Sequence, residues 1–216
     1  MHNSAPALTK KQAAVLSFLF GKVDLGAGVD TLNLRLQGDF SGRFVAAHSK
    51  FEDGLTIVFT LPTYGDSVFF GLAQRSSMET ASVLANLEDY ERTTSALRVG
   101  EAITLPTQDG TNPHLHAVLL LPAATLVVLN SIPYRAKINE SEINFALAAP
   151  LSVEEYEYRT LHGHDSLMDR FQSEGKELVI AWQSGMFILV SDARSFPYCK
   201  VVRIGSFADR QYDIGL

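Results

Sequence analysis

The chain opens with a hydrophobic pattern of helical period. Its apolar positions recur three or four residues apart and so share one face of a helix, at Val15, Leu16, Leu19 and Phe20. Thr9 and Gln12 have the spacing of a capping box, in which each side chain satisfies a free backbone amide at the helix start. We expect this amphipathic helix to end at Gly21, in the left-handed conformation that glycine adopts readily.

The pattern then changes to an alternation of polar and apolar residues, which is typical of strands. Residues 31–36 read Thr-Leu-Asn-Leu-Arg-Leu, so three leucines share one face of a half-buried strand. Further apolar or β-branched runs predict strands at residues 43–51, 55–61, 67–73, 103–105, 116–121, 143–148, 178–182, 186–190 and 200–204. Two stretches, 80–98 and 125–129, fit either a strand or a helix.

A second helix start is predicted after Pro150, which we expect to end the preceding strand. Ser152 and Glu155 form another capping box, and the glutamates of the first turns suit the positive end of the helix dipole. Gly163 is placed to stop this helix, and a shorter helix is expected over residues 165–174. The acidic face of these two helices argues against a role in DNA recognition.

The composition is that of an ordinary globular domain. The 216 residues are 46% hydrophobic and 19% charged, which excludes disordered and collagen-like chains. No linker rich in Pro, Gly or Ser and no internal repeat divides the chain. We therefore predict an α+β fold, a single mixed β-sheet with packed helices over residues 31–216, after an N-terminal helix and lead-in over residues 1–30.

The net charge and the cysteine content limit the class of partner and the cellular compartment that we expect. With 18 Lys and Arg against 24 Asp and Glu, the formal net charge of −6 disfavours nucleic acid as a partner. The single cysteine, Cys199, can form neither an internal disulfide nor a cysteine-based zinc site, so we expect a reducing cytoplasm. The apolar run at residues 13–20 is too short to predict a membrane or export segment.

Four histidines offer the strongest case for a metal. On a strand, His114 and His116 would share one face and could reach the same ion, and His162 and His164, beside Asp165, could supply the remaining ligands. Histidine near a helix end also caps carbonyl groups, which is the commoner explanation. We therefore predict no metal and no cofactor, and a metal-dependent hydrolase using these histidines is the alternative.

The sequence contains no strong catalytic motif. Cys199 lies among residues typical of strand packing, where cysteine is usually an inert small hydrophobe. Ser184 lacks the leading glycine of a nucleophile elbow, and no phosphate-binding loop is present. We expect a protein that is not an enzyme.

One acidic run is a candidate binding surface. Residues 139–157 contain five glutamates and no Lys or Arg. Such a run usually forms a solvated face, but it can also dock a basic protein, because complementary charge steers the encounter. The predicted partner-binding residues are Glu140, Glu142, Glu154, Glu155, Glu157 and Tyr158.

The order of these segments resembles a known family. An apolar strand that ends at a proline, a Glu-rich helix, a His-Gly break and a short Leu/Phe helix are similar to the hallmark of suppressor-of-fused domains. The resemblance covers roughly residues 56–172 and is carried by residues 69–78, 100–105, 109–110, 116–122, 143–150, 152–163 and 165–171, with 192–195 matching a closing Asp/Arg/Ser stretch.

This resemblance implies a suppressor-of-fused-like α/β sandwich without known catalytic residues. Long animal members bind and restrain transcription factors and carry a further C-terminal domain, whereas short bacterial members are associated with polymorphic toxin systems as immunity proteins. We therefore expect a bacterial immunity protein of the short single-domain type that binds and neutralises a cognate toxin. The alternative of the same kind is a regulator that sequesters a transcription factor or another basic protein. The oligomeric state stays open.

Overall fold

The computed structural model describes residues 7–23, 29–36, 39–48, 55–74, 77–105, 115–176 and 178. Its strands are β1 (Val29–Arg35), β2 (Ser41–His48), β3 (Thr56–Leu61), β4 (Ser67–Ala73), β5 (Ala102–Thr104), β6 (Ala117–Pro122), β7 (Arg135–Ile138) and β8 (Ser141–Leu151). Its α-helices are α1 (Lys10–Phe20), α2 (Ser77–Thr93), α3 (Val153–His162) and α4 (His164–Glu174), and two 3-10 turns, η1 (Ala123–Thr125) and η2 (Val127–Leu129), follow β6.

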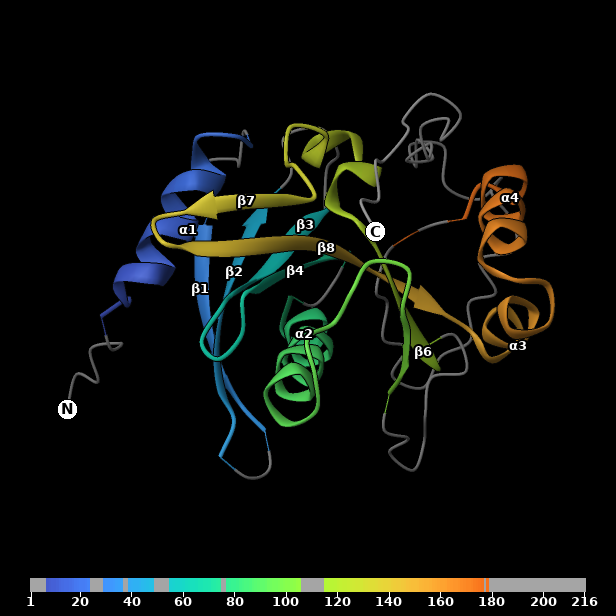
Figure 1. The fold of residues 1–216 in the computed structure, drawn as a ribbon, viewed down its shortest axis with the longest axis horizontal. Coiled ribbons are helices and arrows are strands. Elements are labelled where there is room, and N and C mark those ends of the chain that lie inside the picture. The colour runs from blue at the N-terminus through green and yellow to red at the C-terminus, as the bar shows by residue number, and fades with distance from the viewer. Residues whose placement is uncertain are drawn as a thin grey trace.

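These strands form one mixed sheet in the order β1-β2-β3-β4-β8-β6-β5 (Figure 1). Neighbouring strands are antiparallel except β4 and β8, which run parallel. Asn144 of β8 pairs with Ser67 of β4 and also with Arg135 of β7. Since a strand has only two edges, β7 and β6 occupy successive stretches of the same edge of β8.

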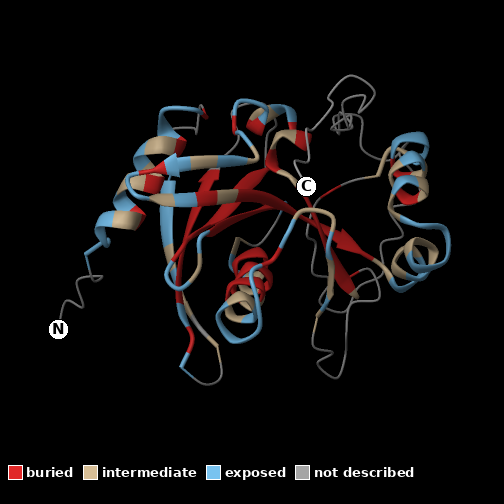
Figure 2. Cartoon of the chain, viewed as in Figure 1, coloured by how far each residue is buried: buried red, intermediate tan, exposed pale blue. Residues whose placement is uncertain are grey.

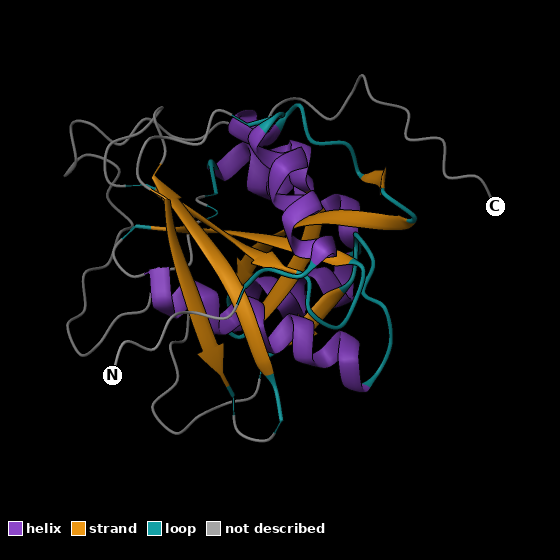
Figure 3. Cartoon of the chain, turned by 90° about the vertical axis from the view of Figure 1, so that its left-hand side faces the viewer, coloured by secondary structure: helices purple, strands orange, loops and turns teal. Residues whose placement is uncertain are grey.

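The central strands are buried on both faces, because their side chains alternate between two apolar layers (Figure 2). In β3, Ile57 and Phe59 belong to one layer and Val58 to the other. Helices cover both layers, and Figure 3 shows them on both sides of the strands. Helices α1 and α4 contribute to the layer of Ile57, whereas α2 covers the layer of Val58.

Most of the expected elements are confirmed within the described residues. The fold is a mixed sheet with packed helices, and both capping boxes are present, at Thr9–Gln12 and at Ser152–Glu155. The ambiguous stretch 80–98 lies mainly in α2, and residues 125–129 lie in the two 3-10 turns. The late strands expected beyond residue 178, and Cys199, lie outside the described residues. Leu178 itself is buried in the layer of Ile57.

Two expectations about local geometry need correction, and one strand was not expected. Gly21 ends α1 with φ −77°, so it does not use the left-handed conformation. Pro150 does not end its strand, because β8 continues to Leu151 and Pro150 pairs with Val118 inside the sheet. Strand β7 was not predicted, since its sequence Arg-Ala-Lys-Ile is short and half charged. None of the described helices is long and apolar enough to cross a membrane.

Candidate functional site

The acidic run at residues 139–157 is divided in space by β8. Glu140 and Glu142 lie at the beginning of this strand, whereas Glu154 and its neighbours follow its end (Figure 1). At about 3.3 Å per residue, the strand separates the two groups by about 30 Å. The predicted partner-binding residues therefore belong to two surfaces and cannot contact one small epitope together.

The first surface is the hairpin between β7 and β8. Asn139 has φ 55° there, a left-handed conformation that asparagine tolerates better than most residues. Glu140 and Glu142 are exposed, and the Glu142 carboxylate lies 3.4 Å from the guanidinium of Arg135. This exposed pair is typical of a solvated strand end.

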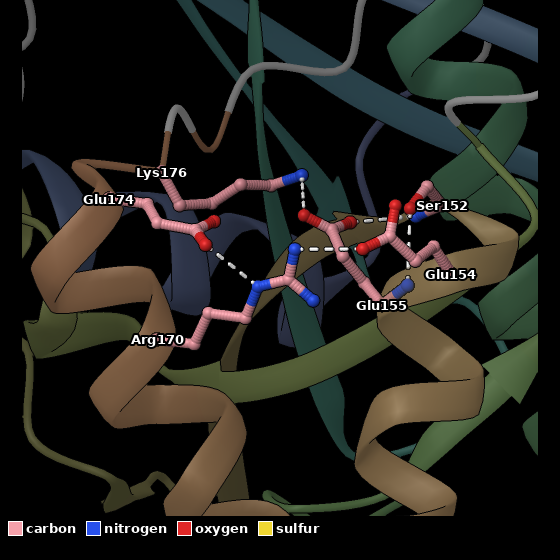
Figure 4. A network of polar contacts seen from close by, with 6 residues as sticks. All are labelled: Ser152, Glu154, Glu155, Arg170, Glu174 and Lys176. Carbon is pink, nitrogen blue, oxygen red and sulfur yellow. Dashed lines mark hydrogen bonds and ion pairs between the residues drawn. The ribbon is translucent and has the colours of Figure 1, made fainter.

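At the second surface, Glu155 is used within the protein. Its carboxylate accepts a hydrogen bond from the backbone amide of Ser152 at 2.8 Å, and the Ser152 hydroxyl accepts one from the Glu155 amide (Figure 4). The ammonium of Lys176 lies 2.6 Å from the same carboxylate, whose side chain is only 14% exposed. Glu155 therefore caps α3 and anchors the chain after α4, and little of it faces solvent.

Arg170 of α4 contacts three side chains, and two of them belong to α3. Its guanidinium contacts Glu154 of α3 at 2.8 Å and Glu174 of α4 at 2.9 Å (Figure 4). It also lies over the Tyr158 ring, with its carbon 5.1 Å from the ring centroid. Hydrogen bonds to the two carboxylates raise the pKa of Arg170, which stays charged. Glu154 and Tyr158 thus hold α3 against α4.

The outward face of α3 remains available for a partner. We call Val153, Glu157 and Leu161 the α3 stripe, because they are four residues apart and so line one side of the helix. Val153 is 43% exposed and Leu161 79% exposed, and no residue of α3 is fully buried. Glu157 is exposed and makes no ion pair with any described residue. An acidic group flanked by two apolar side chains is suited to contact another protein.

Two of the described histidines contact aromatic rings. His116 meets the Tyr156 ring at 5.3 Å between centroids, and His162 meets the Tyr158 ring at 4.4 Å. Burial lowers the pKa of His164, and the positive charge of Arg159 lowers it further. His114 lies outside the described residues. Within the described part of the chain, no three His, Cys, Asp or Glu side chains gather where they could hold a metal ion.

A pair of carboxyl groups that was not expected from the sequence lies under the turn that joins β3 to β4. Glu88 of α2 is 1% exposed, and burial raises its pKa to about 7. Burial also raises the pKa of Glu91, one turn further along α2. A signal was present, because Glu88 lies four residues after Leu84 and thus on the apolar face of the helix.

Comparisons with known proteins identify the fold through a solved structure. No protein-family model matches the chain, and no curated protein matches its sequence. A solved structure of a suppressor of fused homologue from Neisseria gonorrhoeae matches with a TM-score of 0.57 and 15% sequence identity, covering 81% of this chain and 98% of the other. Drosophila Suppressor of Fused matches with a TM-score of 0.42 and 13% identity, covering 76% of this chain and 43% of the other. The chain therefore has a suppressor-of-fused-like fold.

Proposed function

We propose that this suppressor-of-fused-like domain is a non-enzymatic, cytoplasmic protein-binding domain, and that it acts as an immunity protein that neutralises a cognate bacterial toxin. The α3 stripe carries the proposal, because it is an exposed helix face whose central carboxylate has no ion-pair partner in the described chain. The likeness of the fold to a bacterial suppressor of fused homologue supports it.

Charge around the stripe supports a basic partner. Residues 152–176 contain six acidic and three basic residues, so this segment holds a net charge of −3 of the −6 of the whole chain. Because Arg170 and Lys176 pair with Glu154, Glu174 and Glu155, Glu157 is the glutamate of α3 best placed to meet a basic residue of the partner. Such charge accelerates the encounter, and the exposed Leu161 can provide the apolar anchor.

Co-expression with the product of the neighbouring gene tests this function. The expected result is that the two proteins co-purify and that the domain relieves the toxicity of its neighbour. Glu157→Lys and Leu161→Asp should each reduce both effects, because they reverse the charge or remove the apolar anchor of the stripe. Glu142→Lys is the matched control, since it reverses an exposed glutamate about 30 Å away along β8.

The outcomes of these experiments distinguish an immunity protein from a regulator that sequesters a basic protein. A domain that neither binds the neighbouring product nor relieves toxicity would contradict the immunity proposal. Specific binding to a purified DNA-binding protein, with loss of its DNA binding, would instead support sequestration of a basic regulator. Equal effects of Glu142→Lys and Glu157→Lys would place the binding surface away from α3.

A further inference from the structure

The turn between β3 and β4, residues 62–66, rests on a nearly completely buried carboxyl group. One oxygen of Glu88 accepts hydrogen bonds from the backbone amides of Thr63 at 2.6 Å and Tyr64 at 3.4 Å. Its other oxygen, Oε2, is buried without a hydrogen-bond partner in the described chain. A buried charge in such a place is costly, because water no longer solvates it.

A second carboxyl group supports the end of the same turn. One oxygen of Glu91 accepts hydrogen bonds from the Ser67 hydroxyl at 2.6 Å and from the Leu97 amide at 2.9 Å. Its other oxygen lies 2.5 Å from the position that a Cβ at Gly65 would take, so only glycine fits there without a shift of the Glu91 side chain. Glu88 and Glu91 thus hold the turn from the side of α2.

Helix α1 holds the turn from the other side of the sheet. The ammonium of Lys11 donates hydrogen bonds to the Gly65 carbonyl and the Asp66 carboxylate. The side-chain amide of Gln12 donates hydrogen bonds to the Leu61 carbonyl and the Thr63 hydroxyl, both at 3.3 Å. The turn therefore connects α1 to α2 around the ends of strands β3 and β4.

Tyr64 extends the connection to the segment before β2. Its hydroxyl donates to the Asp39 carbonyl at 3.4 Å and accepts from the Ser41 amide at 3.3 Å. Its ring packs on Phe40, and the guanidinium of Arg92 lies over it at 5.4 Å. A change in the position of the turn would therefore affect α1, α2 and the segment before β2.

The charged groups around Glu88 come from each element packed on the turn. On α2, Glu91 opposes ionisation of Glu88, and on α1, Lys11 favours it together with the two backbone amides. Asp66 of the turn opposes ionisation of Glu91, and Lys11 again favours it. Arg92 pairs with Asp89 on the exposed side of α2, with the two groups 2.7 Å apart. Burial outweighs the favourable contacts at both carboxyl groups.

We propose that the proton on Glu88 is a latch, which keeps turn 62–66 fixed between α1 and α2 while it is present and loosens the turn when it leaves. Release of the proton puts a buried negative charge beside the second carboxyl group, Glu91, and opening of the turn lets water reach both. The latch is therefore closed in mildly acidic solution and weaker at neutral pH.

Hydrogen exchange of the Thr63 and Tyr64 amides tests the latch between pH 5 and 8. After correction for the intrinsic rates, Glu88 alone should make their protection fall about tenfold per pH unit up to pH 7 and then level off, since its exposure to water is linked to one proton. Glu88→Gln, which keeps the shape and the acceptor oxygen, should remove this part of the pH dependence and leave only the part that Glu91 contributes. Glu157→Gln, an exposed glutamate of α3, is the control and should keep the full pH dependence.

Two results would overturn the proposal. One is a protection in the unmodified protein that does not change between pH 5 and 7. The other is the same pH dependence in Glu88→Gln as in the unmodified protein. If Glu88→Gln does not fold, the ¹³C shift of the Glu88 carboxyl in the unmodified protein replaces it, and a titration midpoint near 4.5 instead of near 7 would then contradict the latch.

Discussion

Arg170 of α4 lies over the ring of Tyr158 of α3, with the guanidinium carbon 5.1 Å from the ring centroid. The same guanidinium contacts Glu154 at 2.8 Å, so one side chain contacts two residues of the neighbouring helix. Both of those residues, Tyr158 and Glu154, are among the partner-binding residues that the sequence predicts. Their contacts show that they also stabilise the packing of α3 on α4.

Replacing Arg170 by methionine should lower the free energy of unfolding by about 1 kcal/mol. Exposed ion pairs contribute about 0.2–1 kcal/mol each, and an exposed cation–π contact adds about 0.5–1 kcal/mol. Urea denaturation measures the change. Arg135→Met is the control, because within the described residues Arg135 makes one exposed ion pair with another element, at 3.4 Å, and packs on its own neighbour Tyr134. A loss no larger than that of the control would contradict the linking role of Arg170.

Ser152→Ala should destabilise the protein by about 1 kcal/mol, because it removes the side-chain half of a capping box. Thermal and urea denaturation both measure this loss. Thr160→Ala removes an exposed hydroxyl from the same helix, where its one hydrogen bond among the described residues is to the Tyr156 carbonyl, and should have an effect close to zero. Equal losses in the two variants would mean that the cap contributes nothing specific.

Leu19→Ala should cost about 2–5 kcal/mol, which is the usual cost of emptying a leucine site in a packed core. Leu19 is 1% exposed and belongs to the apolar layer of Ile57 on one face of the sheet, whereas its neighbour Phe20 is 45% exposed. Phe20→Ala is therefore the control, with a much smaller expected loss. A small loss in Leu19→Ala would support a separable lead-in over residues 1–30 before a domain at 31–216.

Glu88 should make the protein less stable as the pH rises from about 4.5 to about 7. Because its pKa is raised in the folded state, the folded protein keeps a proton that the unfolded chain releases, so unfolding becomes easier across this range. The shift corresponds to roughly 3 kcal/mol at most, at about 1.4 kcal/mol per pH unit. The measurement is the difference in unfolding free energy between the unmodified protein and Glu88→Gln, because titrating groups that do not interact with Glu88 then cancel. A constant difference would show that the Glu88 pKa is not raised.

Glu157→Lys should slow association with the partner but leave the folding stability within about 0.5 kcal/mol, because Glu157 is exposed and makes no ion pair within the described residues. Stopped-flow or surface binding at two salt concentrations measures the rate. The difference between the variant and the unmodified protein should shrink at high salt, since salt screens exposed charges. An effect confined to the dissociation rate would argue against electrostatic steering by this residue.

Local patterns in the sequence predicted those elements whose causes are local. The capping boxes at Thr9–Gln12 and Ser152–Glu155 are both present, because their hydrogen bonds join residues only three positions apart. Residues 67–73 form β4 as expected, since their apolar run suits a strand buried on both faces. The family resemblance likewise agrees with the suppressor-of-fused-like fold.

Long-range contacts decided what those patterns left open. The glutamates of residues 139–157 are neighbours in sequence, but an extended strand separates them by about 30 Å. Strand β7 forms because an edge of β8 is available to it, although its own residues are half charged. Residues 80–93 are helical because α2 covers an apolar face of the sheet, which residues far away in the chain supply.

The sequence by itself therefore determined the local elements, their caps and the net charge, which depend on residues a few positions apart. Only the tertiary structure decided which charges are free to meet a partner and which are used internally. The sequence predicts that Glu155 caps a helix, but only the tertiary structure shows that Glu155 also binds Lys176 while Glu157 faces solvent. The same holds for Glu88, whose raised pKa arises mainly from its burial by the layers packed around it.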